Sequence, residues 1–275
     1  MANVSIADIK TLREQLGTGM VDTKKALEEA DGDLEKAIEI LRLKGAKGNA
    51  KRADRAATEG LVAATSGDGK ATIVELACET DFVAKNEKFL ALADKVLAAV
   101  AAVGANSVEE ALAADIDGKS VADTIADEAA VIGEKIEIRG VTTLTGDAFQ
   151  IYLHKTNKDL PAQVGVVVAF SGDDAETARS IAQHISFAAP EYLTRDEVPA
   201  EVVDKERDIV TEISRSEGKP EAALPKIIEG RVNAFFKQVV LLDQAYAKDN
   251  KLSIQKVADD AGITISGFER FKVGA

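Results

Sequence analysis

The spacing of apolar residues changes near Thr58, and this change divides the chain into a helical start and a mixed remainder. Before it, apolar residues such as Leu34, Ile38 and Leu41 recur every three or four positions, which predicts helices. After it, EGLVAATSGDGKATIVELACE favours strands, and SGDG at 66–69 predicts a tight hairpin turn. We therefore expect an α+β protein, with a small helical unit ahead of a core that contains antiparallel strands.

Residues 1–43 are predicted to form a three-helix bundle. Ser5 is suited to cap a first helix that runs to Leu16, Asp22 to open a second helix, and Asp33 to cap a third. A bundle of about 40 residues lies near the lower limit for independent folding.

Residues 44–57 differ in composition from both neighbours, since KGAKGNAKRADRAA places basic side chains among Gly and Ala. One interpretation is a solvated linker helix whose charges only face water. The other is a basic strap that touches an acidic partner, because positive charge on an otherwise acidic chain attracts negative surfaces. Both interpretations make this segment a linker between the helical unit and the core.

Residues 58–146 and 147–275 are predicted to be the two parts of the core, with a similar order of elements in each. In the first part, a hairpin is followed by a helix over 86–103 and, after further helices, by a strand over 134–144. In the second part, a hairpin with a longer loop precedes a helix within DAETARSIAQHISFAA. This recurrence indicates two α+β halves related by duplication.

Residues 198–242 are predicted to form an antiparallel helical hairpin within the second part. Pro199 is suited to the start of the first helix, and SEGKPEAALP to the turn between the two. Two helices of about 18 residues would each reach roughly 27 Å. The hairpin either packs flat on a sheet or projects with its apolar stripes sealed against each other, and we expect it to project.

The charge balance limits what the chain can bind. With 47 acidic and 34 basic residues, its formal net charge is −13, which argues against a nucleic-acid-binding surface. The start MANVSIADIKTLREQL lacks the features of a signal peptide, and the longest apolar tract, 89–103, is too short and too charged to span a bilayer. A single cysteine leaves no intrachain disulfide. We therefore expect a cytoplasmic protein with no membrane partner and no direct nucleic-acid partner.

No group of residues predicts covalent chemistry. The segment GTGMVDTKK lacks the glycine spacing and the preceding strand of a phosphate-binding loop. His154 and His184 are too isolated to predict a metal site, and no local motif makes Cys78 a nucleophile. A cysteine at the end of a strand is commonly a small buried side chain. The sequence predicts no catalytic residue, metal, cofactor or small-molecule substrate.

Phe82 is the side chain that these patterns explain least. It lies in CETDFVAKN, between an apolar strand and a helix, with Glu79, Asp81 and Lys85 around it. Phe82 either tucks under its own helix or points at another molecule. The second half has SGDDAETA at the matching junction, and an aromatic needed only for folding would be expected in both halves. We therefore predict that Phe82 is exposed in the free protein.

Several motifs resemble those of bacterial elongation factor Ts. They are LREQLGTGMVDTKKALEEADGDLEKAIEILRLKGAKGNAKRADR, CETDFVAKNEKF, EGRVNAFFKQVVLLDQAY and GFERFKVG, which cover nearly the whole chain in order. The resemblance implies a guanine-nucleotide exchange factor for elongation factor Tu, a GTPase of translation. It also implies a ubiquitin-associated-like helical domain, a two-part α+β core and a helical hairpin.

The resemblance also implies which residues touch the partner. In that family the TDFV stretch dislodges Mg²⁺ at the partner's nucleotide site, and here it consists of Thr80, Asp81, Phe82 and Val83. Asp81 either holds the local backbone, meets a partner group or caps a helix. The other matching partner-binding positions are Arg13, Met20, Val21, Lys24, Ile132, Gly133 and His154.

Two functions of other classes stay open at this stage. One is a non-catalytic scaffold whose helical domain captures a peptide or a ubiquitin-like fold. The other is a thiol enzyme that uses Cys78. Only an exchange factor would accelerate nucleotide release from the GTPase at substoichiometric amounts.

Overall fold

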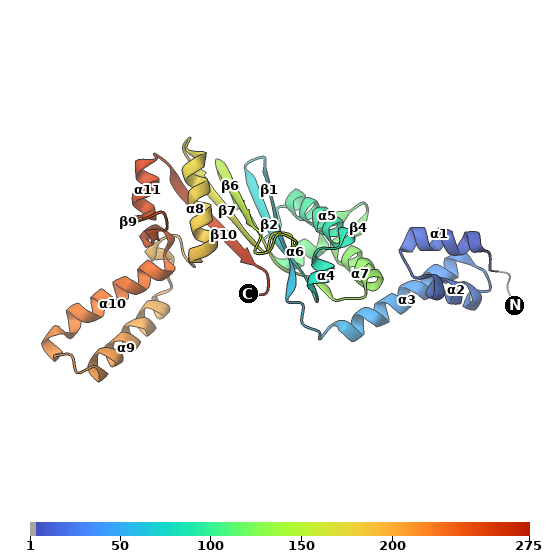
Figure 1. The fold of residues 1–275 in the computed structure, drawn as a ribbon, viewed down its shortest axis with the longest axis horizontal. Coiled ribbons are helices and arrows are strands. Elements are labelled where there is room, and N and C mark those ends of the chain that lie inside the picture. Colours follow the sequence, from blue (N-terminus) through green and yellow to red (C-terminus); the bar gives the residue numbers. More distant parts are fainter. Residues whose placement is uncertain (1–3) are drawn as a thin grey trace.

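The computed structural model describes residues 4–275, in which three parts follow one another along the long axis (Figure 1). A group of three helices lies at one end, two small sheets with their helices form the middle, and a pair of helices extends from the other end. The first three residues of the predicted unit 1–43 lie outside the described residues. None of the helices in the described part of the chain combines the length and the apolar character that crossing a membrane requires.

The N-terminal helices begin and end largely where the sequence predicts. The Ser5 hydroxyl caps the first helix by accepting the Asp8 N–H at 3.0 Å, and the Asp33 carboxylate caps the third. The second helix begins two residues before Asp22, because Gly19 is its N-cap residue, and Asp22 instead places its charge in the first turn. The helices are α1 (Ile6–Leu16), α2 (Met20–Glu29) and α3 (Leu34–Arg52). Their shared core contains Leu12, Ala26, Leu27, Ala30, Ala37 and Leu41.

Helix α3 continues without a break through much of the basic segment 44–57. Its second half packs on α7 (Val121–Ile132), where the Asn49 side-chain amide donates to the Ala126 carbonyl at 2.7 Å. The expected linker helix is therefore present, but one of its faces is docked on the core rather than solvated. The boundary at residue 43 stays a prediction.

Two three-stranded antiparallel sheets form the core, and their strands are connected in the same order. In each sheet a hairpin leads into a helix, and a third strand returns to pair with the second strand of the hairpin. This common order agrees with the predicted duplication. The first sheet contains β1 (Glu59–Gly67), β2 (Lys70–Cys78) and β5 (Ile136–Thr145); the second contains β6 (Ala148–His154), β7 (Val164–Ser171) and β10 (Thr264–Lys272).

Asp–Gly pairs make the two tightest turns of the first half. Gly67 pairs with Lys70, so Asp68 and Gly69 form the predicted two-residue loop, with φ of 52° and 73°. Asp117 and Gly118 form a similar loop, with φ of 55° and 83°. This small hairpin consists of β3 (Asp115–Ile116) and β4 (Lys119–Ser120).

Helices cover the outer face of each sheet. In the first half, α5 buries Phe89 and Val96 against Val74 and Leu76 of β2. In the second half, α8 buries Ile181 against the face of β7. The remaining helices of the first half are α4 (Asp81–Ala84), α5 (Glu87–Val103) and α6 (Val108–Ala113). The second half contains α8 (Ala175–Ala188), α11 (Ile254–Asp260), β8 (Ala245–Tyr246), β9 (Asp249–Ser253) and 3₁₀ turns at Arg195–Glu197, Glu221–Ala223 and Leu241–Asp243.

The inner faces of the two sheets meet in a separate apolar cluster around Val62, Ile73 and Val167. Gly165 permits this close approach, since a Cβ there would lie 2.4 Å from the Val62 side chain. The Phe271 ring, from the last strand, packs against this cluster.

Helices α9 (Ala200–Ser216) and α10 (Leu224–Val239) form the predicted antiparallel pair, and it projects away from the sheets (Figure 1). Val210 and Val232 are buried within it at 5% and 4% exposure. Leu241, just beyond α10, belongs instead to the buried core of the second half. The projecting pair is therefore residues 200–239.

Candidate partner-binding site

Phe82 lies in the single turn of α4 and points away from the core. Its side chain is 73% exposed, whereas Val83 and Ala84 are 9% and 0% exposed. Successive residues of a helix point about 100° apart, so the turn that buries Val83 leaves Phe82 in solvent. The predicted exposure of Phe82 is confirmed. Val83 instead packs in the core of the first half. Its predicted contact with the partner stays a prediction.

The charged neighbours of Phe82 brace its ring. Thr80 is the N-cap residue of α4, since its hydroxyl accepts the Val83 N–H at 3.4 Å. Asp81 pairs with Lys85 one turn later at 3.2 Å, and the Lys85 ammonium lies 4.6 Å from the centre of the Phe82 ring. The interpretation of Asp81 as the helix cap is therefore wrong. Its carboxylate instead holds the ammonium group over the exposed ring.

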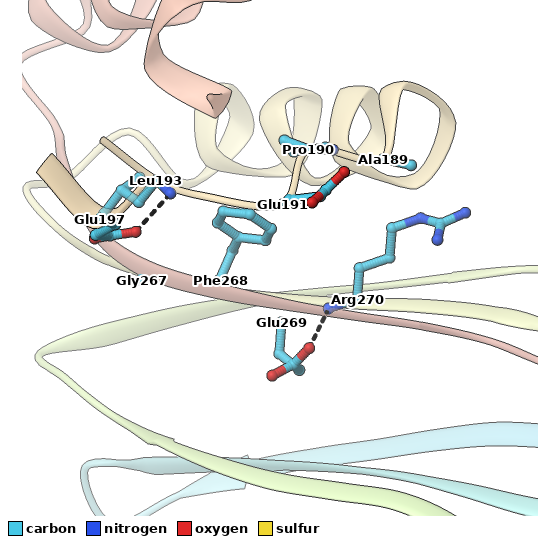
Figure 2. A pocket seen from close by; sticks show the side chains of 9 residues that line it. All are labelled: Ala189, Pro190, Glu191, Leu193, Glu197, Gly267, Phe268, Glu269 and Arg270. Atoms are coloured by element: carbon cyan, nitrogen blue, oxygen red, sulfur yellow. Dashed lines mark hydrogen bonds between the residues drawn. The ribbon is translucent and has the colours of Figure 1, made fainter. Parts of the chain in front are cut away.

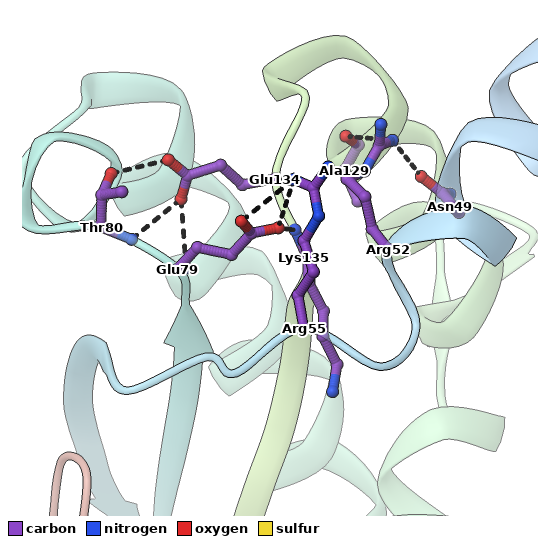
Figure 3. A network of polar contacts seen from close by, with 8 residues as sticks. All are labelled: Asn49, Arg52, Arg55, Glu79, Thr80, Ala129, Glu134 and Lys135. Carbon is purple, nitrogen blue, oxygen red and sulfur yellow. Dashed lines mark hydrogen bonds and ion pairs between the residues drawn. The ribbon is translucent and has the colours of Figure 1, made fainter.

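The segment before α4 is tied to the end of α7 by the Glu134 carboxylate (Figure 3). Oε2 of Glu134 accepts the N–H groups of Glu79 and Thr80 at 3.1 and 3.0 Å, and Oε1 accepts the Thr80 hydroxyl at 2.6 Å. Glu134 directly follows Gly133, the left-handed residue that ends α7 with φ of 87°. The structure thus brings the predicted residues Ile132 and Gly133 beside Thr80.

The Glu79 carboxylate makes the reciprocal contacts. It accepts the Lys135 N–H at 2.6 Å and forms an ion pair with Arg55 at 3.2 Å, and its side chain is 17% exposed. Desolvation raises the pKa of Glu79, but the hydrogen bonds from Lys135 and Arg55, with the charges of Arg55 and Arg52, outweigh it and leave the pKa below its ordinary value. Arg55 of the basic segment therefore contacts an acidic group of its own chain.

The predicted N-terminal contact residues lie around the loop between α1 and α2. Met20 and Val21 expose 59% and 65% of their surface. Arg13 donates to the Thr18 carbonyl at 3.3 Å and so shapes the loop, while Lys24 forms an exposed ion pair on α2. Two apolar side chains in solvent suit a contact surface.

This loop packs against the last turn of α7. A Cβ on Gly17 would lie 3.1 Å from the Val131 side chain and 3.7 Å from the Lys88 ammonium. Val131 immediately precedes Ile132, and Met20 is three residues from the contact. The end of α7 therefore joins the N-terminal set of predicted residues to the Phe82 set.

His154 stands apart from both sets. It ends β6 in the second half, and its Nδ1 lies 3.0 Å from the Tyr152 hydroxyl. Among the contacts of residues 4–275, no hydrogen bond or ion pair joins His154 to the Phe82 loop. An interface that includes His154 has to extend across both halves of the core.

Cys78 has the environment of a structural thiol. Its side chain is fully buried, and Sγ donates to the Thr80 carbonyl at 3.3 Å. Burial, with the charge of Glu134, raises the pKa of Cys78 to about 12. Burial and the raised pKa both argue against a thiolate nucleophile at this position, and so against the thiol-enzyme hypothesis.

The histidines, the cysteine and the acidic side chains of the described residues do not gather into a metal site. Residues 4–275 contain no group of three or more potential metal ligands. His184 is buried, and both of its ring nitrogens are occupied, Nε2 with Gln244 Oε1 at 2.8 Å and Nδ1 with the Ala247 N–H at 3.2 Å. The two histidines thus serve as separate hydrogen-bonding groups.

A hollow of about 450 Å³ lies between the segment after α8 and strand β10 (Figure 2). Figure 2 shows the Phe268 ring at its centre. Two of its three carboxylates are engaged by the fold, since Glu197 accepts the Leu193 N–H at 2.8 Å and Glu269 accepts the Arg270 N–H at 3.1 Å. The hollow offers no pair of groups suited to acid–base or nucleophilic chemistry.

The sequence patterns do not identify Glu134 and Arg55 as residues of this site. Glu134 is 54 residues from Thr80 in the chain, and Arg55 is 24 residues from Glu79. The only local signal is the position of Glu134 between a helix-ending glycine and a strand, where backbone groups need partners.

Comparison with known proteins gives a consistent result. The family model described as elongation factor TS matches residues 79–275. Proteins named elongation factor Ts from Leifsonia xyli subsp. xyli, Clavibacter michiganensis subsp. michiganensis and Micrococcus luteus are 72%, 67% and 55% identical to the chain. These matches extend over 276, 275 and 277 residues and cover the whole of both chains in each comparison. The chain therefore belongs to the elongation factor Ts family.

Proposed function

We propose that this member of the family is the guanine-nucleotide exchange factor for elongation factor Tu, and that Phe82 is its wedge. Acting in the cytoplasm during translation, it promotes GDP release and so allows GTP to reload. The role requires no covalent chemistry, in keeping with the buried thiol of Cys78.

The observation that carries the proposal is an exposed aromatic ring on a braced support. Phe82 is 73% exposed, and its helical turn is fixed by Thr80 and Glu134. Burying a Phe side chain stabilises a complex by about 1.5–3 kcal/mol. Because the ring is already held in position, little of this free energy is lost in ordering it, and most of it contributes to binding.

The binding energy promotes exchange only if it is gained in one state of the partner. A GTPase holds its nucleotide through phosphate contacts and a bridging Mg²⁺. In the proposed mechanism, the Phe82 ring enters a gap that opens when the partner's Mg²⁺ and phosphate site is displaced. Linkage is reciprocal: bound nucleotide weakens the binding of the exchange protein to the GTPase, and the exchange protein weakens nucleotide binding by the same ratio.

One ring does not supply the whole effect. A contribution of about 1.5–3 kcal/mol shifts an equilibrium by one to two decades. Met20 and Val21, both exposed, are proposed to add apolar contacts to the GTPase domain beside the wedge, with Arg13 and Lys24. The other predicted contacts, including His154 in the second half, extend the interface across the core.

Release of a fluorescent GDP analogue from elongation factor Tu tests the proposal. The chain should accelerate release at substoichiometric amounts, because each molecule acts on many GTPase molecules. Stoichiometric binding without faster release would support the scaffold hypothesis instead and would overturn the proposed exchange.

A further inference from the structure

Where β2 and β5 stop pairing, the carboxylates of Glu79 and Glu134 each accept hydrogen bonds from the backbone of the opposite strand end. The backbone ladder ends at the pair Cys78 and Ile136. One residue beyond it, the Glu79 side chain reaches the Lys135 N–H at 2.6 Å. In the opposite direction, Glu134 reaches the N–H groups of Glu79 and Thr80 (Figure 3). Side chains therefore continue the cross-strand hydrogen bonding after the strands have separated.

These contacts are of a strong kind. Hydrogen bonds in which a carboxylate accepts backbone N–H groups are shorter and about twice as strong as neutral ones. Glu134 accepts two backbone N–H groups at 3.1 and 3.0 Å and the Thr80 hydroxyl at 2.6 Å, in a partly buried position. Water therefore competes with them less than it does with the surface ion pair between Asp81 and Lys85.

The contacts of Glu134 lead directly to the wedge. The Thr80 hydroxyl donates to Glu134 Oε1 and accepts the Val83 N–H, so one group joins the brace to the start of α4. A helix of four residues does not hold itself in place in water. Phe82 does little to hold α4 on the core, because most of its ring is in solvent.

From this geometry we infer that Glu134 is a positioning residue for exchange, which holds α4 in the orientation that points Phe82 out of the core. The inference rests on the proposed function and deepens it. Glu134 acts through Phe82 and needs no contact of its own with the partner.

A double-mutant cycle tests the dependence on Phe82. Glu134→Ala should slow the maximal rate of stimulated GDP release by about threefold or more, and by no more than Phe82→Ala does, since only the presentation of the wedge is lost. In the Phe82→Ala background, Glu134→Ala should have almost no further effect. If the two substitutions instead slowed release independently, so that their effects multiplied in the double variant, Glu134 would act without Phe82 and the inference would be wrong.

The conservative variant separates positioning from charge. Glu134→Gln should restore release to within about twofold of the wild type, because an amide oxygen can accept both backbone N–H groups and the amide NH₂ can donate to the Thr80 hydroxyl. Failure of Gln to restore release would assign Glu134 a charged contact with the partner instead. Glu110→Ala is the matched control: it removes a carboxylate that accepts the Asn106 N–H at 2.8 Å on α6, and should leave release unchanged.

A spectroscopic readout works on the free protein. The chain has three tyrosines but no tryptophan, so Phe82→Trp introduces one tryptophan at the wedge, which is excited selectively at wavelengths that tyrosine does not absorb. Adding Glu134→Ala should lower the fluorescence anisotropy of Trp at this position, whereas Glu134→Gln and Glu110→Ala should not. Unchanged anisotropy with Glu134→Ala would overturn the inference.

The outcomes separate the two proposals. A wild type that fails to accelerate GDP release would refute the proposed function, while the anisotropy would still decide whether Glu134 positions α4. Should Glu134→Ala prevent folding, as circular dichroism would show, Thr80→Val carries the test by removing only the joining hydroxyl. It should lower the anisotropy and slow release, and no change in either would contradict the inference.

Discussion

Replacing Phe82 with Ala separates stability from exchange, because the ring is 73% exposed. Full burial of a Phe side chain is worth about 1.5–3 kcal/mol, so the quarter that is buried accounts for about 0.4–0.8 kcal/mol. The Lys85 ammonium over the ring adds about 0.5–1 kcal/mol at an exposed site. We expect Phe82→Ala to lower the free energy of unfolding by about 1 kcal/mol.

The loss in exchange should be larger. If the partner covers the exposed 73% of the ring, the complex with the displaced site gains about 1.1–2.2 kcal/mol from Phe82. At about 1.4 kcal/mol per decade, removal of the ring should slow stimulated release by about 6- to 40-fold. The complex itself should still form through the remaining contacts.

Phe89 is the matched control, since the same residue type lies seven positions later with no exposed surface. Phe89→Ala should cost about 3–5 kcal/mol of stability, the usual range for a core Phe. The folded fraction of this variant should nevertheless exchange normally. Denaturant unfolding and fluorescent GDP release measure the two quantities. A Phe82→Ala variant that unfolds as easily as Phe89→Ala, but exchanges normally when folded, would refute the reasoning.

Three further changes test the fold. Burial raises the pKa of Glu75 despite a hydrogen bond from the Gly274 N–H, so Glu75→Gln should raise the melting temperature at pH 7. This gain should shrink as the pH falls through the raised pKa and the wild-type carboxyl takes up its proton; a constant gain would contradict the assignment. Burial lowers the pKa of His184, so stability should fall as the pH drops below about 6.5, and His184→Asn should weaken that dependence in thermal melts at pH 7.5 and 5.5. Replacing residues 200–239 by a short Gly–Ser turn should leave the core's unfolding transition in place, as the buried Val210 and Val232 lie within the projecting pair; loss of that transition would show that the pair supports the sheets.

The elements of the fold follow from local patterns, and this is why the sequence predicts them. The Asp68–Gly69 turn and the caps at Ser5 and Asp33 each involve residues within three or four positions of one another. Their structural effect does not depend on distant parts of the chain. The docking of α3 on α7 is different, because Asn49 and Ala126 are 77 residues apart. The same basic sequence is compatible with a solvated helix and with a docked one.

The site shows a similar limit. The resemblance groups Thr80, Asp81, Phe82 and Val83 as one contact stretch, but consecutive residues in one helical turn point in different directions. Thr80 bonds to Glu134, Val83 is buried, and only the Phe82 ring is free to reach a partner with most of its surface. A motif read as letters carries no information on these directions, which the helical turn and its N-cap determine.

The two halves differ at the corner between the end of the strand ladder and the helix that follows. In the first half the ladder ends at Cys78 and Ile136; in the second it ends at Ser171 and Thr264. The residues just beyond the second ladder include Gly172 and Gly262, whose backbones approach so closely that a Cβ on Gly172 would lie 2.6 Å from the Gly262 carbonyl oxygen.

The matching positions of the first half hold Glu79 and Glu134, whose carboxylates accept N–H groups from the opposite strand end. In the first half the extra turn α4 follows Thr80 directly and carries Phe82. In the second half the glycines close the corner, and the chain passes into α8 from Asp174, which caps that helix by accepting the Thr177 N–H at 2.9 Å. The proposed wedge thus lies in the half whose strand ladder ends in carboxylates, and the half whose ladder ends in glycines, residues 147–275, has no counterpart of α4.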